Sequence, residues 1–286
     1  MHRDRIAIRQ RRTMTDRRRG IVLVTVLWSI ALLSALAMAA SMNLRGFTAL
    51  LALHKNRVQA EALLVGGLES AAHILNTLGD IPLTDVEITI TLSGGSVRVE
   101  LSDEGGRVDI GKAPVEVLAA LFRFVGAQDR DANAIASAIV NSRKSVDGKV
   151  LVQPFTDLYQ IRWLPGVRPE WLTALEPLTT VFGSETVNPS TAPQDVIAAM
   201  PGVDASRVGA FMQMRREFPE DANRSVGLLG AAQAYFEVKT RPVASVKLTA
   251  TLKNGFTRAA HAVILSTPEE ERPYRVLVWR YLPSKS

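Results

Sequence analysis

One stretch of the sequence limits what this chain can fold into more than any other. Residues 21–44 contain no charged side chain. At about 1.5 Å of rise per residue, a helix of this length spans the roughly 30 Å hydrocarbon core of a membrane. The segment before it, "DRRRG" at 16–20, is rich in arginine. Because positive flanks tend to stay in the cytoplasm, we expect a single-pass helix with a cytoplasmic N-terminus and with residues 45–286 outside the cytoplasm.

Two other interpretations of this stretch remain open from the residues alone. A secretory signal peptide has an apolar region of roughly 7–15 residues followed by small residues, and "ALAMAAS" at 35–41 offers such a cleavage site. A plain membrane anchor has the same apolar run. The N-terminus of the mature chain distinguishes these interpretations.

The distribution of charge limits the classes of function. The chain has a formal net charge of +6. Residues 1–20 hold eight of the 34 basic and two of the 28 acidic residues, so the rest of the chain is formally neutral. There is no cysteine, which excludes disulfides and thiolate metal sites. We find no P-loop, nucleophile elbow or dinucleotide fingerprint. The four histidines have no ligand-like spacing, so we expect leader or surface roles for them: His2, His54, His73 and His261. We therefore expect a protein that is not an enzyme.

The apolar run does not end in a helix breaker. Residues 43–78 contain no proline, and apolar residues recur there at helical spacing between charged ones. This pattern predicts that the membrane helix continues as an amphipathic helix outside the membrane. The apolar residues that recur at this spacing are Leu50, Leu53, Val58, Ala62, Val65, Leu68, Ala72 and Leu75.

Two regions alternate apolar and polar residues as β-strands do. "DVEITITLSGGSVRVEL" at 85–101 predicts a hairpin that turns at Gly94 and Gly95. "VASVKLTATLKNGFTRAAHAVIL" at 243–265 predicts a second hairpin with a type I′ turn at Asn254 and Gly255. "YRVLVWRYL" at 274–282 predicts a last strand.

Between these strands, residues 111–231 have a helical pattern that repeats. "VDIGKAPVEVLAAL" at 108–121 aligns with "VNPSTAPQDVIAAM" at 187–200. We expect the proline of each copy in the first turn of a helix, and Thr191 as a cap of the second helix. "LPGV" at 164–167 and "MPGV" at 200–203 each suit the turn of a helix-hairpin-helix element, which is best known for binding the DNA backbone. Residues 111–231 hold 12 basic and 13 acidic residues, and this balance argues against DNA.

The basic leader that ends in glycine, the long helix, the hairpins and the duplicated insert together resemble the K-type minor pseudopilins of type II secretion along essentially the whole chain. The resemblance implies that a prepilin peptidase cuts between Gly20 and Ile21 and that the new N-terminus is methylated. Most pilins carry glutamate at the fifth position after the cut, where this chain has Thr25. Lacking that glutamate is typical of the K-type subunit.

The resemblance also implies a fold and a set of partners. The fold is α+β: a pilin-like N-terminal helix, transmembrane in its first half, packs on an antiparallel sheet that carries an inserted helical domain. The expected parts are a cleaved leader (1–20), a transmembrane half-helix (21–44), an amphipathic helix and first hairpin (45–110), the insert (111–231) and the C-terminal strands (232–286).

The implied function is a place at the tip of the periplasmic pseudopilus, anchored in the inner membrane, in support of protein export. The implied partners are the I-type and J-type minor pseudopilins, the prepilin peptidase and the inner-membrane assembly platform, and no nucleic acid. The alternative is a membrane-anchored DNA-binding or DNA-uptake protein. No cofactor is expected, although the family sometimes binds calcium in this domain. The acidic residues that raise this question are Asp103, Glu104, Asp129 and Asp131, and we assign no ligands among them.

Overall fold

The computed structural model describes residues 9–79, 81–83, 85–143, 154–219, 222–239 and 242–283. For residues 9–21, 40–46, 49 and 222–223 it describes the backbone alone. The first eight residues of the predicted leader therefore lie outside the described part. The chain divides into two units, Met1–Val58 and Gln59–Ser286, and each is described by itself.

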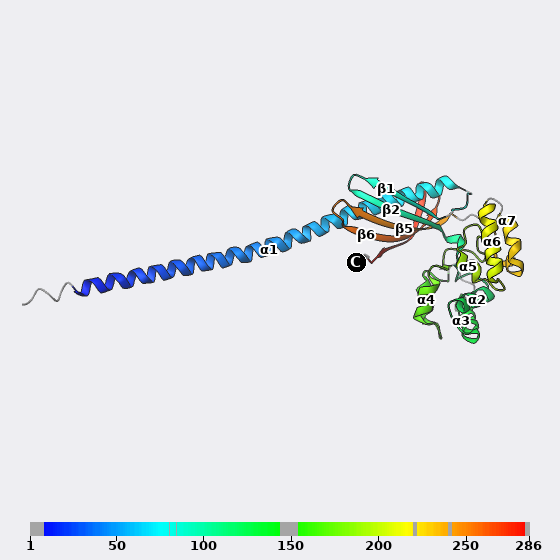
Figure 1. The fold of residues 1–286 in the computed structure, drawn as a ribbon, viewed down its shortest axis with the longest axis horizontal. Helices are drawn as coiled ribbons and strands as arrows, with labels where there is room; N and C mark the ends of the chain where they lie inside the picture. Colours follow the sequence, from blue (N-terminus) through cyan, green and yellow to red (C-terminus); the bar gives the residue numbers. More distant parts are fainter. Residues whose placement is uncertain are drawn as a thin grey trace, which may run out of the picture. The chain divides into compact units, whose positions relative to one another are not determined.

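Helix α1, Arg9–Leu78, includes the expected membrane segment and the expected amphipathic segment in one element (Figure 1). Of the apolar residues that recur along the amphipathic segment, only Leu68, Ala72 and Leu75 are buried. Leu50, Leu53 and Val58 are 60%, 45% and 63% exposed in the first unit, and Val65 is 51% exposed in the second. Helical spacing of apolar residues does not specify which turns another element covers.

In the second unit, the C-terminal turns of α1 pack against a sheet. The side chains buried there are Ala60, Leu63, Leu64, Leu68, Ala71, Ala72 and Leu75. Gly67 lies in this contact, and a Cβ on it would come within 2.8 Å of a methyl carbon of Val97. The glycine therefore allows the helix backbone to approach the strand closely.

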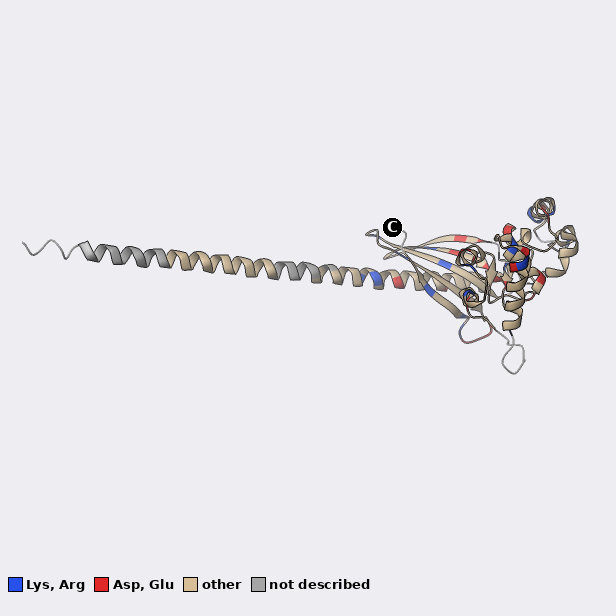
Figure 2. Cartoon of the chain, turned by 90° about the horizontal axis from the view of Figure 1, so that it is seen from below, with Lys and Arg blue, Asp and Glu red and all other residues tan. Residues whose placement is uncertain are grey.

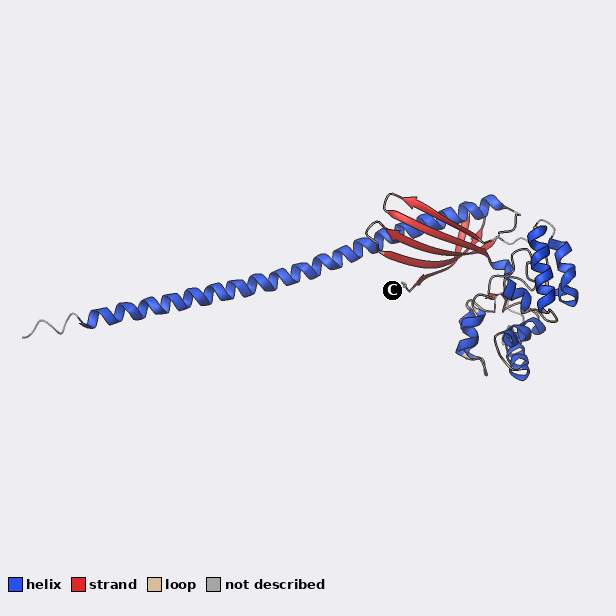
Figure 3. Cartoon of the chain, in the orientation of Figure 1, coloured by secondary structure: helices blue, strands red, loops and turns tan. Residues whose placement is uncertain are grey.

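The sheet has five antiparallel strands in the order β1-β2-β5-β6-β7. Figure 3 draws its strands in red. They are β1 (Val86–Leu92), β2 (Gly95–Asp103), β5 (Val243–Leu252), β6 (Thr257–Ser266) and β7 (Tyr274–Leu282). The two predicted hairpins and the last strand are thus confirmed. β2 and β5 are direct neighbours, with Gly95 opposite Leu252 and Asp103 opposite Ala244, so the helical region begins and ends beside one strand pair.

The two faces of the sheet differ in character. One face contributes apolar side chains to the core beneath α1, among them Val97, Val99, Leu248 and Ala262. On the alternate positions, a row of polar residues crosses all five strands. Its members lie directly opposite one another in sequence register: Glu87, Glu100, Lys247, His261 and Arg280. Period-two alternation puts such residues on the face opposite the core.

Both predicted turns differ in detail from the structure. In the first hairpin Leu92 pairs with Gly95, so Ser93 and Gly94 form the turn. In the second, the type I′ prediction is wrong because a type I′ turn needs positive φ at both central residues. Gly255 has φ of 84°, and no non-glycine residue in the described part has positive φ. The amide of Leu252 donates to the carbonyl of Phe256 at 2.9 Å, which closes a three-residue loop with glycine in the left-handed position.

The helical region lies between β2 and β5 and has its own apolar core. Its elements are η1 (Glu104–Gly106), β3 (Val108–Asp109), α2 (Val115–Phe124), α3 (Asp129–Ser142), η2 (Leu158–Trp163), α4 (Pro169–Leu175), β4 (Thr179–Thr180), α5 (Gln194–Ala198), α6 (Ala205–Glu217), α7 (Ala222–Val226) and η3 (Gly227–Tyr235). β3 and β4 form a short parallel pair.

The sequence duplication corresponds to a duplicated loop and helical hairpin, α2–α3 and α5–α6. In the first loop the amide of Gly111 donates to Oδ1 of Asp109 at 2.7 Å, and in the second the amide of Ser190 donates to Oδ1 of Asn188 at 3.1 Å. Each turn thus uses an acceptor side chain at the same position of the repeat.

An arginine from the second helix of each hairpin closes each loop. Nη2 of Arg143 donates to the carbonyls of Ile110 and Ala113 at 3.0 and 2.8 Å. Nη1 of Arg215 donates to the carbonyls of Pro189 and Ala192 at 3.0 and 2.6 Å. Burial lowers the pKa of both guanidinium groups, and both stay charged at neutral pH because an arginine titrates far above it.

The expected helix starts need correction. Pro114 and Pro193 occupy the N-cap positions with ψ of 155° and 151°, not the first helical turn. Thr191 does not cap α5. Its hydroxyl donates to Oδ2 of Asp103 at 2.6 Å. The two residues are far apart in sequence, so a local sequence pattern does not predict this contact.

Candidate functional site

The three residues singled out for processing and assembly lie close together on α1. Gly20 and Ile21 belong to the helix, and the side chain of Ile21 is not among those described. Thr25 donates its hydroxyl to the carbonyl of Val22 at 2.9 Å, and Ser29 donates to the carbonyl of Thr25 at 2.8 Å. Such bonds satisfy a hydroxyl within its own helix. A threonine here therefore brings little of the cost that a carboxylate would bring in lipid.

Within the described residues, one helix is long and apolar enough to cross a membrane, and its span is Val22–Ala39. Figure 2 draws this span without a charged residue. Its side chains are exposed in the structure, including Leu23 at 66% and Trp28 at 74%. These exposed apolar side chains need a lipid or protein environment.

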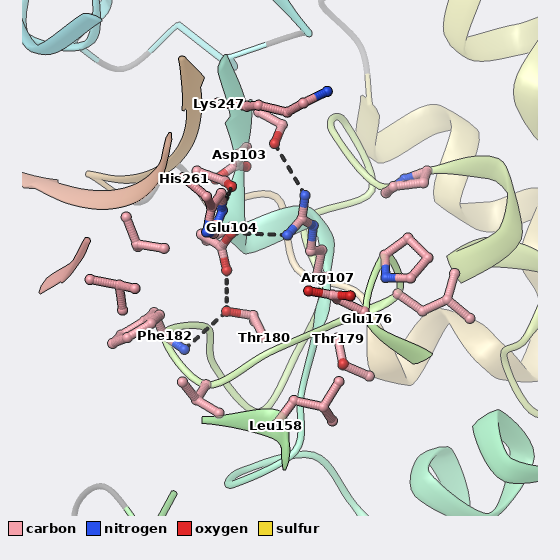
Figure 4. A pocket seen from close by; sticks show the side chains of 18 of the residues that line it. Asp103, Glu104, Arg107, Leu158, Glu176, Thr179, Thr180, Phe182, Lys247 and His261 are labelled. Atoms are coloured by element: carbon pink, nitrogen blue, oxygen red, sulfur yellow. Dashed lines mark hydrogen bonds and ion pairs between the residues drawn. The ribbon is translucent and has the colours of Figure 1, made fainter. Parts of the chain in front are cut away.

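A polar junction joins β2 to the helical region (Figure 4). It centres on Asp103 and Glu104, which are only 8% and 3% exposed. Oε2 of Glu104 accepts a hydrogen bond from the hydroxyl of Thr180, and Oε1 accepts one from Nη1 of Arg107 at 3.1 Å. Asp103 accepts from the amide of Gly105 at 2.8 Å as well as from Thr191. Two adjacent buried carboxylates thus accept hydrogen bonds from Thr180 and Thr191, which lie far along the chain in the helical region.

The charge state of this junction depends on burial. Burial raises the pKa of the Glu104 carboxyl, and the neighbouring charge of Asp103 adds to this rise. The nearby guanidinium of Arg107 and the hydrogen bond from Thr180 lower the pKa and only partly offset burial. Removing a carboxylate from water disfavours its charged form.

A serine and a histidine lie next to the junction on β5 and β6. Oγ of Ser245 and Nε2 of His261 are 2.7 Å apart, a distance that a nucleophile and its base would also show. A catalytic histidine, however, is oriented by a third group on its other nitrogen. Nδ1 of His261 is buried without a hydrogen-bond partner in the described part. Burial also lowers the pKa of His261 to about 4, so the imidazole is a weak base near neutral pH.

The surface role expected for His261 is therefore wrong. The residue lies at a polar position of β6, but the helical region faces that side of the sheet and leaves the side chain only partly exposed. Alternation in a strand predicts the face on which a side chain lies, and not what covers that face.

A cavity of about 850 Å³ lies between the polar face of the sheet and the helical region. Its lining includes Glu100, Lys247, His261 and Arg280 from the sheet. Across the cavity, Nη2 of Arg280 contacts Oε1 of Glu176 at 2.6 Å. The helical region is thus held to the sheet by the junction and by this partly exposed ion pair.

The residues that raised the question of calcium lie in different elements. Asp103 and Glu104 already have the protein partners described above, whereas Asp129 and Asp131 lie in the first turn of α3. Nε of Arg123 pairs with Oδ1 of Asp129. Among the residues that the structure describes, no three His, Cys, Asp or Glu side chains are grouped so that they could hold a metal ion. We assign no metal ligands.

Comparisons with known proteins find a match in structure and none in sequence. No protein-family profile matches the sequence, and no curated protein matches it. Among solved structures, the chain matches a chain of the GspK-GspI-GspJ complex of the type 2 secretion system from enterotoxigenic Escherichia coli. The TM-score is 0.60 at 14% sequence identity, and the match covers 81% of this chain and 98% of that chain.

The fold is GspK-like. The expected fold class, an N-terminal helix with an antiparallel sheet and a helical region, is confirmed. At this identity the likeness concerns the GspK-like fold alone, and the roles of Gly20, Ile21 and Thr25 in processing and assembly stay predictions.

Sequence reasoning missed most of the polar junction. The GspK-like fold brings Glu104 and Thr180 together across 76 positions, and Asp103 and Thr191 across 88. The one local signal was the adjacent acidic pair in "SDEGG" directly after an apolar strand. Two carboxylates at the end of a buried strand need hydrogen-bond or charged partners. The sequence indicates this need but does not identify the partner residues.

Proposed function

We propose that this chain is a minor pseudopilin of a type II secretion system. The observation that carries the proposal is the GspK-like fold joined to a helix whose span Val22–Ala39 is apolar enough for a membrane. The chain is anchored in the inner membrane by α1, with its N-terminus in the cytoplasm and the bulk of the chain in the periplasm. It contributes no catalysis, and its role in protein export is structural.

The proposed position is the tip of the pseudopilus, with the I-type and J-type minor pseudopilins as neighbours. Thr25 supports this position. In pilin assembly a joining subunit uses its glutamate to neutralise the N-terminal amine of a subunit already in place, because a buried unpaired charge is costly. This chain has no carboxylate at that position. Its own N-terminal amine pairs with the glutamate of a partner. It has no carboxylate at position 25 to neutralise the N-terminal amine of a partner.

Processing and assembly complete the proposal. The prepilin peptidase removes residues 1–20 and the new N-terminus at Ile21 is methylated. The assembly platform of the inner membrane then receives the processed subunit. The helical region adds bulk beside the sheet, which suits a terminal subunit better than one stacked between two others.

The second candidate is a membrane-anchored DNA-binding protein, because two helical turns have the proline-glycine sequence of helix-hairpin-helix elements. Gly166 and Gly202 have φ of 87° and 74°, as such tight turns require. The near balance of 12 basic and 13 acidic residues in 111–231 weighs against it, since binding to phosphates needs an excess of lysine and arginine.

Site-specific crosslinking tests the tip position directly. A photo-crosslinker placed between residues 22 and 30 should join the chain to a neighbour on one side only in assembled pseudopili, with I-type or J-type subunits among the products. Crosslinks to neighbours on both sides would contradict the tip position. Retention of the chain on a DNA column that falls steeply with salt would favour the second candidate.

A further inference from the structure

The turn between η2 and α4 exposes a large aromatic side chain. Trp163 is 77% exposed, the highest value among the large apolar side chains described outside α1. Single exposed apolar residues are common on protein surfaces. Tryptophan is the largest of them, however, and it is enriched among the residues that dominate binding between proteins.

One arginine lies against the exposed indole, and a second arginine belongs to the same short segment. The guanidinium of Arg162 lies 4.3 Å from the centre of the Trp163 ring, a stacked arrangement that holds both side chains in place. Arg168 lies 5.0 Å from the ring of Trp171. In the part of the chain that the structure describes, neither guanidinium forms an ion pair with a carboxylate. Residues 162–170 contain one acidic residue, Glu170, so this turn presents excess positive charge beside an apolar ring.

The second proline-glycine turn shows that the fold does not require this arrangement. There, Ala199 and Met200 occupy the places of Trp163 and Leu164, and both are 3% exposed. The arginine nearest to that turn is neutralised, because Nε of Arg207 lies 3.4 Å from Oδ2 of Asp204. The same tight turn therefore forms with a buried alanine in place of an exposed tryptophan.

We propose that residues 162–168, the Trp163 turn, form a docking surface for an acidic segment of a partner protein. The indole packs against an apolar side chain of the partner, and Arg162 and Arg168 pair with carboxylates beside it. Charge complementarity selects such a partner over a basic one. Nucleic acid fits less well, because the surrounding helical region has no excess of positive charge to neutralise a phosphate backbone. This inference does not depend on the assignment as a pseudopilin.

A peptide titration tests the proposal on the full chain in detergent micelles. The probe is a fluorescein-labelled eight-residue peptide of alternating glutamate and leucine, and its glutamine–leucine counterpart is the neutral control. We expect saturable binding of the acidic peptide by fluorescence anisotropy and much weaker binding of the neutral one. Trp163→Ala and Arg162→Ala should each weaken binding about tenfold or more, whereas Trp163→Tyr should keep most of it.

Phe218→Ala is the matched control variant. Phe218 is 44% exposed and also lies beside an arginine, with Arg224 at 5.6 Å from its ring, but it belongs to the end of α6. Its removal should leave binding unchanged. No saturable binding of the acidic peptide, binding that is equal in Trp163→Ala, or a loss of equal size in Phe218→Ala would overturn the proposal. So would tighter, Trp163-dependent binding of a short DNA duplex.

Discussion

Arg143 and Arg215 occupy equivalent places in the duplicated hairpins, and each donates two hydrogen bonds to the loop that precedes its hairpin. The loops carry carbonyl groups that neither a helix nor a strand satisfies. One buried guanidinium supplies the donors in each copy. The duplication thus extends from sequence to a shared means of closing a loop.

The equivalent contacts of Arg143 and Arg215 predict that replacing either arginine lowers the folding stability by a similar amount. Arg143→Met and Arg215→Met should each destabilise the protein by about 1–3 kcal/mol, because two carbonyls lose a charged donor while burial of the charge is relieved. Chemical denaturation measures this loss. Arg216→Ala, an exposed neighbour on α6, is the control and should change stability by less than about 0.5 kcal/mol. A large loss in one copy and none in the other would contradict the equivalence.

Glu104 predicts a dependence of stability on pH. Its pKa is raised in the folded protein, so the folded state binds its proton more tightly than the unfolded state does. The contribution of Glu104 to stability is therefore fully present below the unfolded pKa and falls as the pH rises through the folded pKa. Glu104→Gln should remove this fall. Denaturation of both proteins across acidic to neutral pH measures it, and parallel curves would show that the group does not titrate as expected.

The lowered pKa of His261 predicts that stability depends on pH with the opposite sign. Its pKa falls from 6.5 to about 4 on folding, so the unfolded state binds more protons between these values. Stability should therefore rise with pH from about 4 to 6.5, by about 3 kcal/mol at most. His261→Gln should flatten this rise, while His54→Gln on α1 is the control. The imidazole resonances in NMR follow the titration directly, and an ordinary pKa at His261 would refute the prediction.

We predict that the mature protein begins at Ile21. Intact-mass analysis of the chain extracted from membranes should show a start at Ile21 with one added methyl group. Gly20→Ala keeps the charge of the leader and serves as the processing variant, which we expect to stay uncut. A start near Ser41 would instead indicate cleavage by signal peptidase and would remove the pilin interpretation.

Thr25→Glu tests the chemistry of the membrane segment. A carboxylate near the middle of a membrane helix costs roughly 2.5–3.5 kcal/mol on insertion scales, and less near the interface. The variant should therefore insert less completely than the wild type, which a membrane-fractionation assay measures. Thr25→Ser retains a hydroxyl that bonds within the helix and should insert normally. Equal insertion of Thr25→Glu would mean that the position lies outside the hydrocarbon core.

Local patterns predicted the strands and helices because alternation and helical spacing depend on near neighbours. β7 was predicted with its observed bounds, Tyr274–Leu282. What failed depends on contacts between distant residues. The partner of Thr191, for example, comes from β2. The type I′ turn failed for a local reason, since Asn-Gly also suits a three-residue loop.

In the candidate site too, local features were predicted from the sequence and contacts between distant residues were not. Thr25 and the charge-free span follow from composition, whereas the junction of Glu104 with Thr180 depends on how the helical region returns to the sheet. His261 was visible as a polar residue in a strand, but its burial required knowledge of the covering elements.

The direct pairing of β2 with β5 has a consequence for engineering. In the sheet alone, every strand is antiparallel to its neighbour, so the order is that of a simple meander. The entire helical region occupies the place of one hairpin loop. A chain in which a short glycine-containing turn joins Asp103 to Val243 should retain a complete five-stranded sheet with α1 on its apolar face. The strand pairing of the sheet therefore does not depend on the helical region, which occupies a single connection between two neighbouring strands.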